Sequence, residues 1–477
     1  MTQVDATAPA VPRSREIFTN RTLNLRAIRA VGFDMDYTLV HYHVEEWEQR
    51  AYESARKRLI QDGWPLHGFR FDPGCVSLGL VLDLELGNIV KASRFGYVTR
   101  ATHGTRRLSF EAQRAAYARV LVDLEEPRWV FLNTLFALSE AALYAQLVDL
   151  LDAGKLPAGL GYADLYRRLR AAHDHVHTEG ALKQDIAADP ERYVDRDPEL
   201  ALTLLDLKAA GKQLLVVTNS EWWFTRAMLS YALDRDLPSG QTWRDLFDLV
   251  IVDARKPTFF ATESPIYEIV DEAGLLRPYS GEFRLGGAYL GGSAAFVERN
   301  LGLIGEQILY VGDHIAADVR ASKDLLRWRT ALILRDLEPE LDEQDQFAPR
   351  QAELSDLMQR KERLEHEAAW VRLQQQRQRE AYGPQPTESS GKLKQRAQAL
   401  RTELEQLDAQ VAPLAREAGE LRHERWGPLM TAGNDKSHLA RQIERSADIY
   451  MSRVSNLLHH TPFAYLRAPG GSMPHDP

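Results

Sequence analysis

Short apolar runs alternate with helical patterns in two parts of the chain, before residue 45 and after residue 195. Each run is bounded by polar or turn-forming residues, which is typical of a buried strand. Helical periodicity covers 200–207 and 222–233 between these runs. Strands that alternate with helices predict an α/β fold with a doubly wound parallel sheet. The predicted strands span 30–33, 213–220, 247–252, 307–311 and 329–334.

The glycine-rich stretch 286–292 lies between two of these strands. It lacks the strand-then-helix context that a dinucleotide-binding fingerprint requires. We therefore expect it to be a loop.

The segment 45–195 has mixed patterns and separates the first predicted strand from the second. Helical periodicity covers 45–60, 131–151 and 162–174. Leucines alternate with other residues over 80–86, a Gly-Asn turn follows, and a second strand at 89–92 completes a predicted hairpin. We expect this segment to form a mixed α/β cap over the strand ends.

The C-terminal third changes to a heptad pattern. Apolar residues recur in steps of four and three, and a weaker seam of the same kind precedes them. A loop at 383–391 separates the seams, so we expect an antiparallel helical hairpin, with Pro413 kinking its second helix. Its role would be scaffolding or subunit contact. The seams are Leu354, Leu357, Leu364, Ala368 and Val371, then Leu393, Ala397, Leu400, Leu404, Leu407, Val411, Leu414, Ala418 and Leu421.

These patterns divide the chain into five predicted parts. A length of 477 residues is enough for two or three domains. We expect a disordered N-terminus over 1–24 and a C-terminal tail over 461–477. The α/β core would comprise 25–44 and 196–345, the cap 45–195, and the helical extension 346–460.

Composition and charge argue against several classes of protein. The formal net charge of -9 disfavours a nucleic acid as the main partner. No apolar stretch approaches the ~20 residues that a membrane span needs, and the N-terminus lacks the apolar core of a signal peptide. The single cysteine, Cys75, fits a reducing compartment. We therefore expect a cytoplasmic protein with neither nucleic acid nor membrane as a partner.

Four predicted strands end in polar residues. Because ligands of open α/β sheets bind beyond the carboxyl ends of the strands, we expect these residues to lie together. Each has an ordinary explanation when taken alone, such as a surface lysine, a helix cap or an acidic loop. Their joint order and spacing argue for a functional site. They are Asp34 and Asp36, Thr218 and Asn219, Lys256, and Asp313 with Asp318.

This set suits the transfer of a phosphoryl group, whose transition state spreads negative charge over three oxygens. Lys256 and the hydroxyl of Thr218 can hold these oxygens, and Mg²⁺ bound by Asp34 and Asp313 can neutralise them. Asp34 stands at the strand end and is the natural nucleophile. Asp36 can protonate the leaving oxygen and later activate water.

The same segments resemble the four motifs of the haloacid dehalogenase superfamily of phosphohydrolases. More narrowly, the chain resembles the cytosolic purine 5'-nucleotidases, which prefer IMP and GMP. The resemblance implies a Rossmannoid core and an Mg²⁺ cofactor. It rests on Gly32-Phe33-Asp34-Met35-Asp36-Tyr37-Thr38-Leu39, Thr218-Asn219-Ser220, Ala254-Arg255-Lys256-Pro257 with Phe259-Phe260, Gly312-Asp313-His314-Ile315, Phe463-Ala464-Tyr465-Leu466 and Met473-Pro474-His475.

The resemblance also implies a role for each core residue. Asp34 would be the phosphorylated nucleophile. Asp36 would be the general acid and base, and a metal ligand through its carbonyl. Asp313 would complete the metal site, with Asp318 supporting it from behind. Phosphate would be bound by Thr218, Asn219, Ser220 and Lys256.

A second matching set lies in the predicted cap and would contact the purine nucleotide. From the sequence alone, Phe136 is a core aromatic and His177 a buried core histidine. The resemblance instead implies that these two rings stack on the purine and that Arg170 donates to its edge. The full set is Phe136, Arg170, Asp174, His177 and Lys183.

Two positions depart from the family pattern. Vertebrate members have an effector site with an aromatic residue just after the Asp-His-Ile motif and a lysine farther on. Ala316 and Asp324 occupy those positions here, although Asn133 matches. Effector activation of that form is therefore not expected.

The resemblance and the heptad seam together imply a homodimer or homotetramer.

Three functions are compatible with the sequence. The leading hypothesis is an Mg²⁺-dependent 5'-nucleotidase that hydrolyses purine mononucleotides through an aspartyl-phosphate and can also transfer the phosphate to a nucleoside. The first alternative is a phosphatase for another small phosphomonoester. The second is a nucleotide-binding or scaffold protein with a vestigial site.

Overall fold

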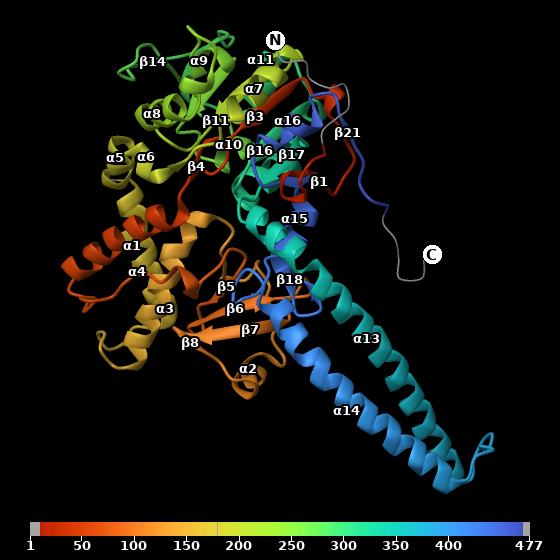
Figure 1. The fold of residues 1–477 in the computed structure, drawn as a ribbon. Coiled ribbons are helices and arrows are strands. Elements are labelled where there is room, and N and C mark those ends of the chain that lie inside the picture. The colour runs from red at the N-terminus through yellow and green to blue at the C-terminus, as the bar shows by residue number, and fades with distance from the viewer. Residues whose placement is uncertain (1–9, 179, 471–477) are drawn as a thin grey trace. The chain divides into compact units, whose positions relative to one another are not determined.

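The chain divides into two compact units in a computed structural model that describes residues 10–178 and 180–470 (Figure 1). The first unit comprises Met1–Glu338 and Leu429–Pro477, and the second comprises Pro339–Pro428. Residues 429–460, which we had expected in the helical extension, therefore belong to the first unit. The separation of core from cap at residues 45 and 195 remains a prediction.

A mainly parallel sheet forms the centre of the first unit. Its first central strand in sequence, β3, lies between β16 and β11, so the chain winds outward to both sides of it. This confirms the predicted doubly wound α/β fold. From edge to edge the described strands are β1 (Phe18–Thr19), β20 (Ile449–Met451), β17 (Arg329–Ile333), β16 (Ile308–Gly312), β3 (Ala30–Phe33), β11 (Gln213–Val217), β12 (Leu249–Val252), β15 (Gly287–Gly291), β13 (Ile266–Ile269) and β14 (Leu276–Pro278).

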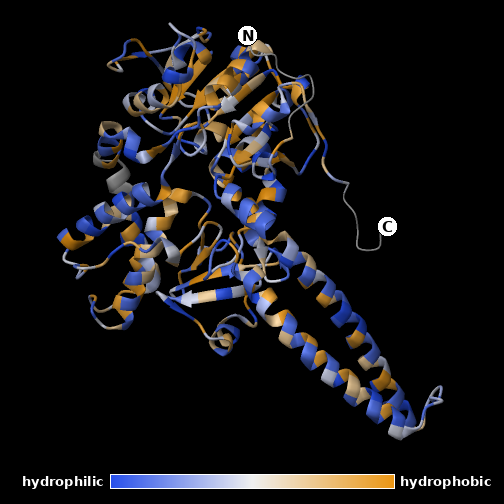
Figure 2. Ribbon diagram, viewed as in Figure 1, coloured by the Kyte–Doolittle hydropathy of each residue, from blue (hydrophilic) through white to orange (hydrophobic). Residues whose placement is uncertain are grey.

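Both faces of this sheet are buried, which explains why its strands have continuous apolar runs. Alternate residues of β3 and β11 join two different hydrophobic clusters. Val31 and Leu214 pack in one cluster, and Ala30 and Leu215 pack in the other. Figure 2 shows the apolar residues concentrated on these strands.

Helices flank the sheet and its connections. The predicted helix at 222–233 is α8 (Trp222–Leu233), and the one at 200–207 extends to α7 (Leu200–Ala209). The others of the core are α9 (Trp243–Leu246), α10 (Thr258–Ala261), α11 (Ala294–Leu301), a π-helix at Ile315–Arg320, α12 (Ala321–Leu326), α15 (His438–Ser446) and α16 (Asn456–His460).

Two segments differ from the sequence-based expectation. The stretch 286–292, which we expected to be a loop, contains strand β15, because its glycines pair with β12 on one side and β13 on the other. Residues 13–24, which we expected to be disordered, contain β1 and β2 (Leu23–Asn24). These strands pair with β20 and with β21 (Tyr465–Leu466), respectively. Residues 1–9 and 471–477 lie outside the described residues.

The segment 45–195 contains an antiparallel sheet packed with helices. Its strands run in the order β8 (Arg106–Arg107), β7 (Val98–His103), β6 (Asn88–Ala92), β5 (Val81–Asp83) and β9 (Trp129–Phe131). The predicted hairpin is β5 with β6. The helix predicted from residue 131 begins only at residue 138, because residues 129–131 pair with β5. Its helices are α1 (Val44–Gln61), α2 (Phe110–Tyr117), α3 (Leu138–Asp152), α4 (Tyr162–Thr178), α5 (Ala181–Ala188) and α6 (Pro190–Tyr193). The short strands β4 (His41–Tyr42) and β10 (Val194–Asp195) pair where the chain enters and leaves this segment.

The second unit is an antiparallel pair of long helices, α13 (Leu337–Glu380) and α14 (Ser390–Glu420). The heptad residues meet in two clusters, one around Leu407 and one around Leu393. Ion pairs Arg360–Glu403 and Lys361–Asp408 join the outer faces. Helix α14 continues through Pro413, and the kink expected there remains a prediction. Among the described residues, no helix has the length and apolarity that a membrane span requires.

Candidate active site

The polar residues that follow the central strands meet at one edge of the main sheet. The parallel pairing continues for one residue past the strands, since the amide of Asp34 donates to Val311 O and that of Thr218 to Ile251 O, each at 2.9 Å. These side chains line one cavity of about 490 Å³. All the predicted core residues lie there, from Asp34 and Asp36 through Thr218, Asn219, Ser220 and Lys256 to Asp313 and Asp318.

Lys256 is the buried centre of this arrangement. Its Nζ lies 2.9 Å from Asp34 Oδ1 and 2.7 Å from Asp318 Oδ1, and it donates to the hydroxyl of Tyr310 at 3.1 Å. Burial alone would lower the pKa of Lys256, but Asp318 and Asp34 raise it well above its ordinary value. Lys256 is therefore a fixed cation beside Asp34.

The backbone of Lys256 is held by one amide side chain. Asn219 Oδ1 accepts from the backbone amide of Lys256 at 2.7 Å, and Asn219 Nδ2 donates to its carbonyl at 3.2 Å. These two hydrogen bonds tie the loop after β12 to the loop after β11, so Lys256 and Thr218 are kept on the same side of the cavity.

Asp36 is oriented by two hydroxyl groups. Tyr42 donates to Asp36 Oδ1 at 2.5 Å, and Ser220 donates to Asp36 Oδ2 at 2.6 Å. Burial raises the pKa of Asp36. Lys183, from α5, donates from its Nζ to the hydroxyl of Ser220 at 3.2 Å and forms an ion pair with Glu221 at 2.6 Å. Asp36 is thus fixed and favours a bound proton more than an exposed carboxylate does.

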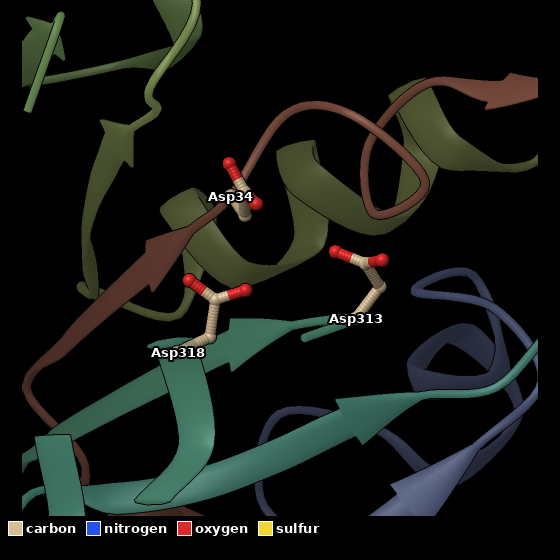
Figure 3. A group of neighbouring side chains, drawn as sticks. All are labelled: Asp34, Asp313 and Asp318. Carbon is tan, nitrogen blue, oxygen red and sulfur yellow. The ribbon is translucent and has the colours of Figure 1, made fainter. Parts of the chain in front are cut away.

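Three carboxyl groups form a cluster that fits a hard cation. Asp34, Asp313 and Asp318 each offer one oxygen, and these atoms lie within 4.8 Å of one another. Figure 3 shows the three side chains pointing toward one another. Burial raises the pKa of Asp34 to about 6, and burial with the neighbouring carboxylates raises that of Asp313 well above its ordinary value. Oxygen-only donors and crowded negative charge are the features that Mg²⁺ sites share.

The carboxyl group of Asp36 is not part of this cluster, because its oxygens face Tyr42 and Ser220. Asp318 belongs to the cluster but already faces Lys256, and the backbone amide of His314 donates to its second oxygen at 3.2 Å. Asp34 and Asp313 are therefore the members best able to bind a metal directly.

The 45–195 segment closes the other side of the cavity. Phe136 packs against Tyr37, with ring centroids 4.6 Å apart, and it lines the cavity. Arg170, half exposed, forms an ion pair with the buried Glu140 at 3.0 Å. Lys183 also lines the cavity. Asp174 and His177 fall within α4, but their side chains lie outside the described residues.

Several residues of the site were not found from the sequence. Tyr310 and Tyr42 hold Lys256 and Asp36, Glu140 pairs with Arg170, and Thr134 donates to Asp313 Oδ2 at 3.4 Å. A tyrosine within an aliphatic strand, as at position 310, is the one signal that the sequence carries. The other contacts join residues far apart in the chain.

A sequence profile of the 5' nucleotidase family matches residues 17–477. The chain belongs to this family. It is 31% identical to human 5'-nucleotidase domain-containing protein 1 over 344 residues, which cover 66% of this chain and 73% of the relative. A 5'-nucleotidase domain-containing protein of Dictyostelium discoideum is 26% identical over 475 residues, 97% of this chain and 75% of the relative. Human 5'-nucleotidase domain-containing protein 2 is 29% identical, with 68% of this chain and 64% of the relative covered.

Two solved structures are also similar to this 5' nucleotidase family member. One is a predicted phosphoglycolate phosphatase from Haemophilus somnus, with a TM-score of 0.27 and 14% identity over 64% of this chain and 85% of that one. The other is a haloacid dehalogenase-like hydrolase from Xanthomonas campestris, with a TM-score of 0.25 and 12% identity over 64% and 82%. These scores are too low to support an argument. The family match confirms the predicted resemblance to 5'-nucleotidases and the assignment to phosphoric monoester hydrolases.

Proposed function

We propose that this 5' nucleotidase family member is an Mg²⁺-dependent enzyme that hydrolyses purine nucleoside 5'-monophosphates of the IMP and GMP type. The observation that carries the proposal is the position of Asp34. It stands beside the fixed cation Lys256 in a cavity that Phe136 and Arg170 also line. A nucleotide has matching parts, an anionic phosphate for the cation and a flat base for the aromatic ring.

Substrate binding would use the polar residues after the central strands and the residues of the 45–195 segment. The phosphate oxygens would accept from Lys256, from the hydroxyl of Thr218 and from Asn219, in place of water. The base would lie against Phe136, and Arg170 would donate to the oxygen of a 6-oxopurine. Lys183 would add positive charge near the phosphate.

The reaction would have two steps. In the first, a carboxylate oxygen of Asp34 attacks phosphorus, the bond to the 5' oxygen breaks, and Asp36 gives its proton to that oxygen, so the nucleoside leaves. In the second, Asp36 takes a proton from water, which attacks the aspartyl-phosphate and releases phosphate, regenerating Asp34. A nucleoside hydroxyl in place of water would give phosphate transfer instead.

The residues present fit a divalent cation in this site. Asp34 and Asp313 would hold Mg²⁺ with the carbonyl of Asp36, and Asp318 would orient Lys256 behind them. When bound, the ion would neutralise charge on the transferring phosphoryl group. We also expect the enzyme to act in the cytoplasm as a homodimer or homotetramer.

The test is phosphate release from IMP, GMP, AMP, UMP and sugar phosphates, with and without Mg²⁺, by the wild type and Asp34→Asn. We expect release from IMP and GMP to exceed release from the other substrates, and to be lost without metal or in the variant. Asn is isosteric with Asp, so the fold is retained while the nucleophile is removed. Inosine added to the same assay would test phosphate transfer.

Two outcomes would contradict parts of the proposal. Activity spread evenly over sugar phosphates would preserve the chemistry of Asp34 and reject the purine assignment of Phe136 and Arg170. No Mg²⁺-dependent activity on any of these substrates would reject the enzymatic assignment and favour a binding or scaffold protein.

A further inference from the structure

A second large cavity lies at the opposite ends of the strands from the candidate active site. Its volume is about 940 Å³, and its lining includes residues that come just before β3, β16 and β17. Because these three strands are parallel, their amino ends meet here, whereas Asp34 and Asp313 follow the carboxyl ends. The two cavities share no lining residue.

This cavity carries an excess of positive charge. Six cationic side chains line it, against three carboxylates, although the whole chain has a formal net charge of -9. Positive charge has therefore been gathered here against the overall balance of the molecule. The six are Arg21, Arg26, Arg29, Lys323, Arg327 and Arg329.

One buried carboxylate holds part of this set in place. Asp448 is 1% exposed, forms an ion pair with Lys323, and lies 2.8 Å from Arg329 Nε and 3.8 Å from Arg21 Nη1. Burial lowers the pKa of Lys323, and Arg21 and Arg329 lower it further against the pull of Asp448. Three cations thus share one anion, which leaves a net positive and preorganised wall.

Three more arginines complete the lining. Arg26, Arg29 and Arg327 are exposed, and none of them forms an ion pair with any residue in the described part of the chain. Of the remaining carboxylates, Asp324 faces Arg320 at 3.5 Å, which leaves Glu306 to balance all three. A guanidinium with no carboxylate partner is suited to bidentate recognition of a phosphate group.

We propose that this cavity binds a small anion with two or more phosphate groups. Its volume lies near the upper end of the ~300–1,000 Å³ typical of ligand sites. The cations come from several elements, including the segment before β3, α12 and the start of β17, so one orthophosphate would meet only part of them. Of the two positions that depart from the effector-site pattern, Asp324 lines this cavity and Ala316 does not. Because the cavity shares no lining residue with the catalytic cavity, the site goes beyond the proposed hydrolysis.

The test is calorimetric titration of the full chain with inorganic tripolyphosphate, without Mg²⁺, so that no ion competes for the probe. We expect the triple variant Arg26→Ala/Arg29→Ala/Arg327→Ala to bind roughly tenfold or more weakly than the wild type, because each lost contact is a charge-assisted hydrogen bond. The matched control is Arg106→Ala/Arg107→Ala/Arg119→Ala, three exposed arginines outside this cavity, which should bind like the wild type.

A second measurement separates this cavity from the catalytic one. Any competitive inhibition of aryl phosphate hydrolysis by tripolyphosphate reports binding beside Asp34, and its inhibition constant should be the same in the wild type and the triple variant. Equal binding by the wild type and the triple variant would overturn the proposal. So would equal affinity for orthophosphate and tripolyphosphate, or the absence of binding to the wild type. Because the three arginines are exposed, circular dichroism should show all variants folded.

Discussion

At the scale of single residues, the candidate site depends on hydroxyl groups that hold charged side chains in position. Tyr310 is buried; its hydroxyl accepts from Lys256 Nζ and donates to the carbonyl of Val217 at 2.9 Å. Tyr42 and Ser220 hold Asp36 in a similar way, each donating a hydrogen bond to one of its carboxylate oxygens. The chemistry of the acids and the lysine is therefore set by neighbours that do not themselves react.

The change Tyr310→Phe should lower kcat while the chain remains folded. It removes the hydroxyl that fixes Lys256 and leaves the carbonyl of Val217 without this donor, so we expect a stability loss of about 1–3 kcal/mol and a clear fall in phosphate release. Urea unfolding and steady-state kinetics would measure both. The control is Tyr289→Phe, which removes another buried hydroxyl of the same sheet, one that accepts from the amide of Arg284. An equal kcat in both variants would contradict the positioning role.

Glu48 should make the stability of the protein depend on pH. It is fully buried in α1, and burial raises its pKa to about 8. The backbone amide of Ser139 donates to Glu48 Oε2 at 2.7 Å, which lowers the pKa but does not outweigh burial. The folded state therefore keeps a proton on Glu48 at pH values where the unfolded state, with a pKa of 4.5, has released it. The protonated Glu48 stabilises the folded state fully below pH 4.5, and this stabilisation is lost as the pH rises from there through 8. Wild type should lose on the order of 2–4 kcal/mol relative to Glu48→Gln between pH 5 and 8.

Urea unfolding at the two pH values would measure this difference. The matched control is Glu45→Gln, an exposed position of the same helix, which should follow the wild type. A constant difference between wild type and Glu48→Gln across this pH range would show that Glu48 does not titrate as expected.

Much of this residue-level arrangement follows from the sequence, and the rest does not. Asp34 and Asp313 stand directly after buried strands, and Lys256 follows another strand by four residues, so their convergence at one sheet edge could be predicted from the topology alone. The pairing of Lys256 with Asp318 joins a loop to the π-helix at Ile315–Arg320 and depends on side-chain direction, which no local pattern encodes. Glu140 lies one helical turn beyond Phe136 in a largely apolar helix, and its pairing with Arg170 requires the packing of α3 on α4.

At the scale of elements, the segment 45–195 reaches the core through α5. Lys183 of this helix contacts Ser220 and Glu221 at the start of α8. A pair of this kind, partly exposed on the glutamate side, contributes only about 0–1 kcal/mol to stability. Its larger effect would be electrostatic, because it brings a cation to the cavity that also contains Asp34 and Asp36.

The change Lys183→Met should therefore act on substrate binding. We expect KM for the nucleotide to rise roughly three- to tenfold, from loss of one charge contact with the phosphate, with kcat within about twofold of the wild type. The control is Lys208→Met, which removes a lysine of α7 that pairs with Asp248. If KM is the same in all three proteins, Lys183 serves the fold and not the substrate.

The strands that were missed carry a weak hydrophobic pattern, each for its own reason. Strand β15 was taken for a loop because glycine supplies no side-chain signal, yet Gly287 pairs with β12 and Gly291 pairs with β13. Strand β20 is only three residues long, Ile449–Met451, and it follows a heptad region that dominates the pattern. Strands buried on both faces, such as β11, were predicted because nearly all of their residues are apolar, as in Leu214–Val217.

At the scale of the whole molecule, residues from both ends of the chain complete the main sheet of the first unit. β20 pairs with β17 on one side and with β1 on the other, and Asp448 anchors the end of β17 through the amide of Thr330 at 3.1 Å. The edge with the candidate active site thus belongs to a sheet that includes residue 18 and residue 451.

A chain that ends after Glu338 should fail to fold cooperatively, although it retains every residue of the proposed site. It loses β20, which leaves an edge of β17 unpaired and exposes apolar surface. The control ends after Gly470 and keeps all the described elements. Thermal unfolding followed by circular dichroism should show a cooperative transition for the control and none for the shorter chain. A cooperative transition in the shorter chain would contradict this dependence.

The pairing of β20 with β17 also has a consequence for synthesis on the ribosome. Residue 449 is made long after residue 333, with the whole helical pair in between, which at ~5–20 residues per second takes roughly 6–23 s. During this interval the nascent chain carries a nearly complete sheet with one open edge. We therefore expect a chaperone to bind the open edge of β17 before translation ends.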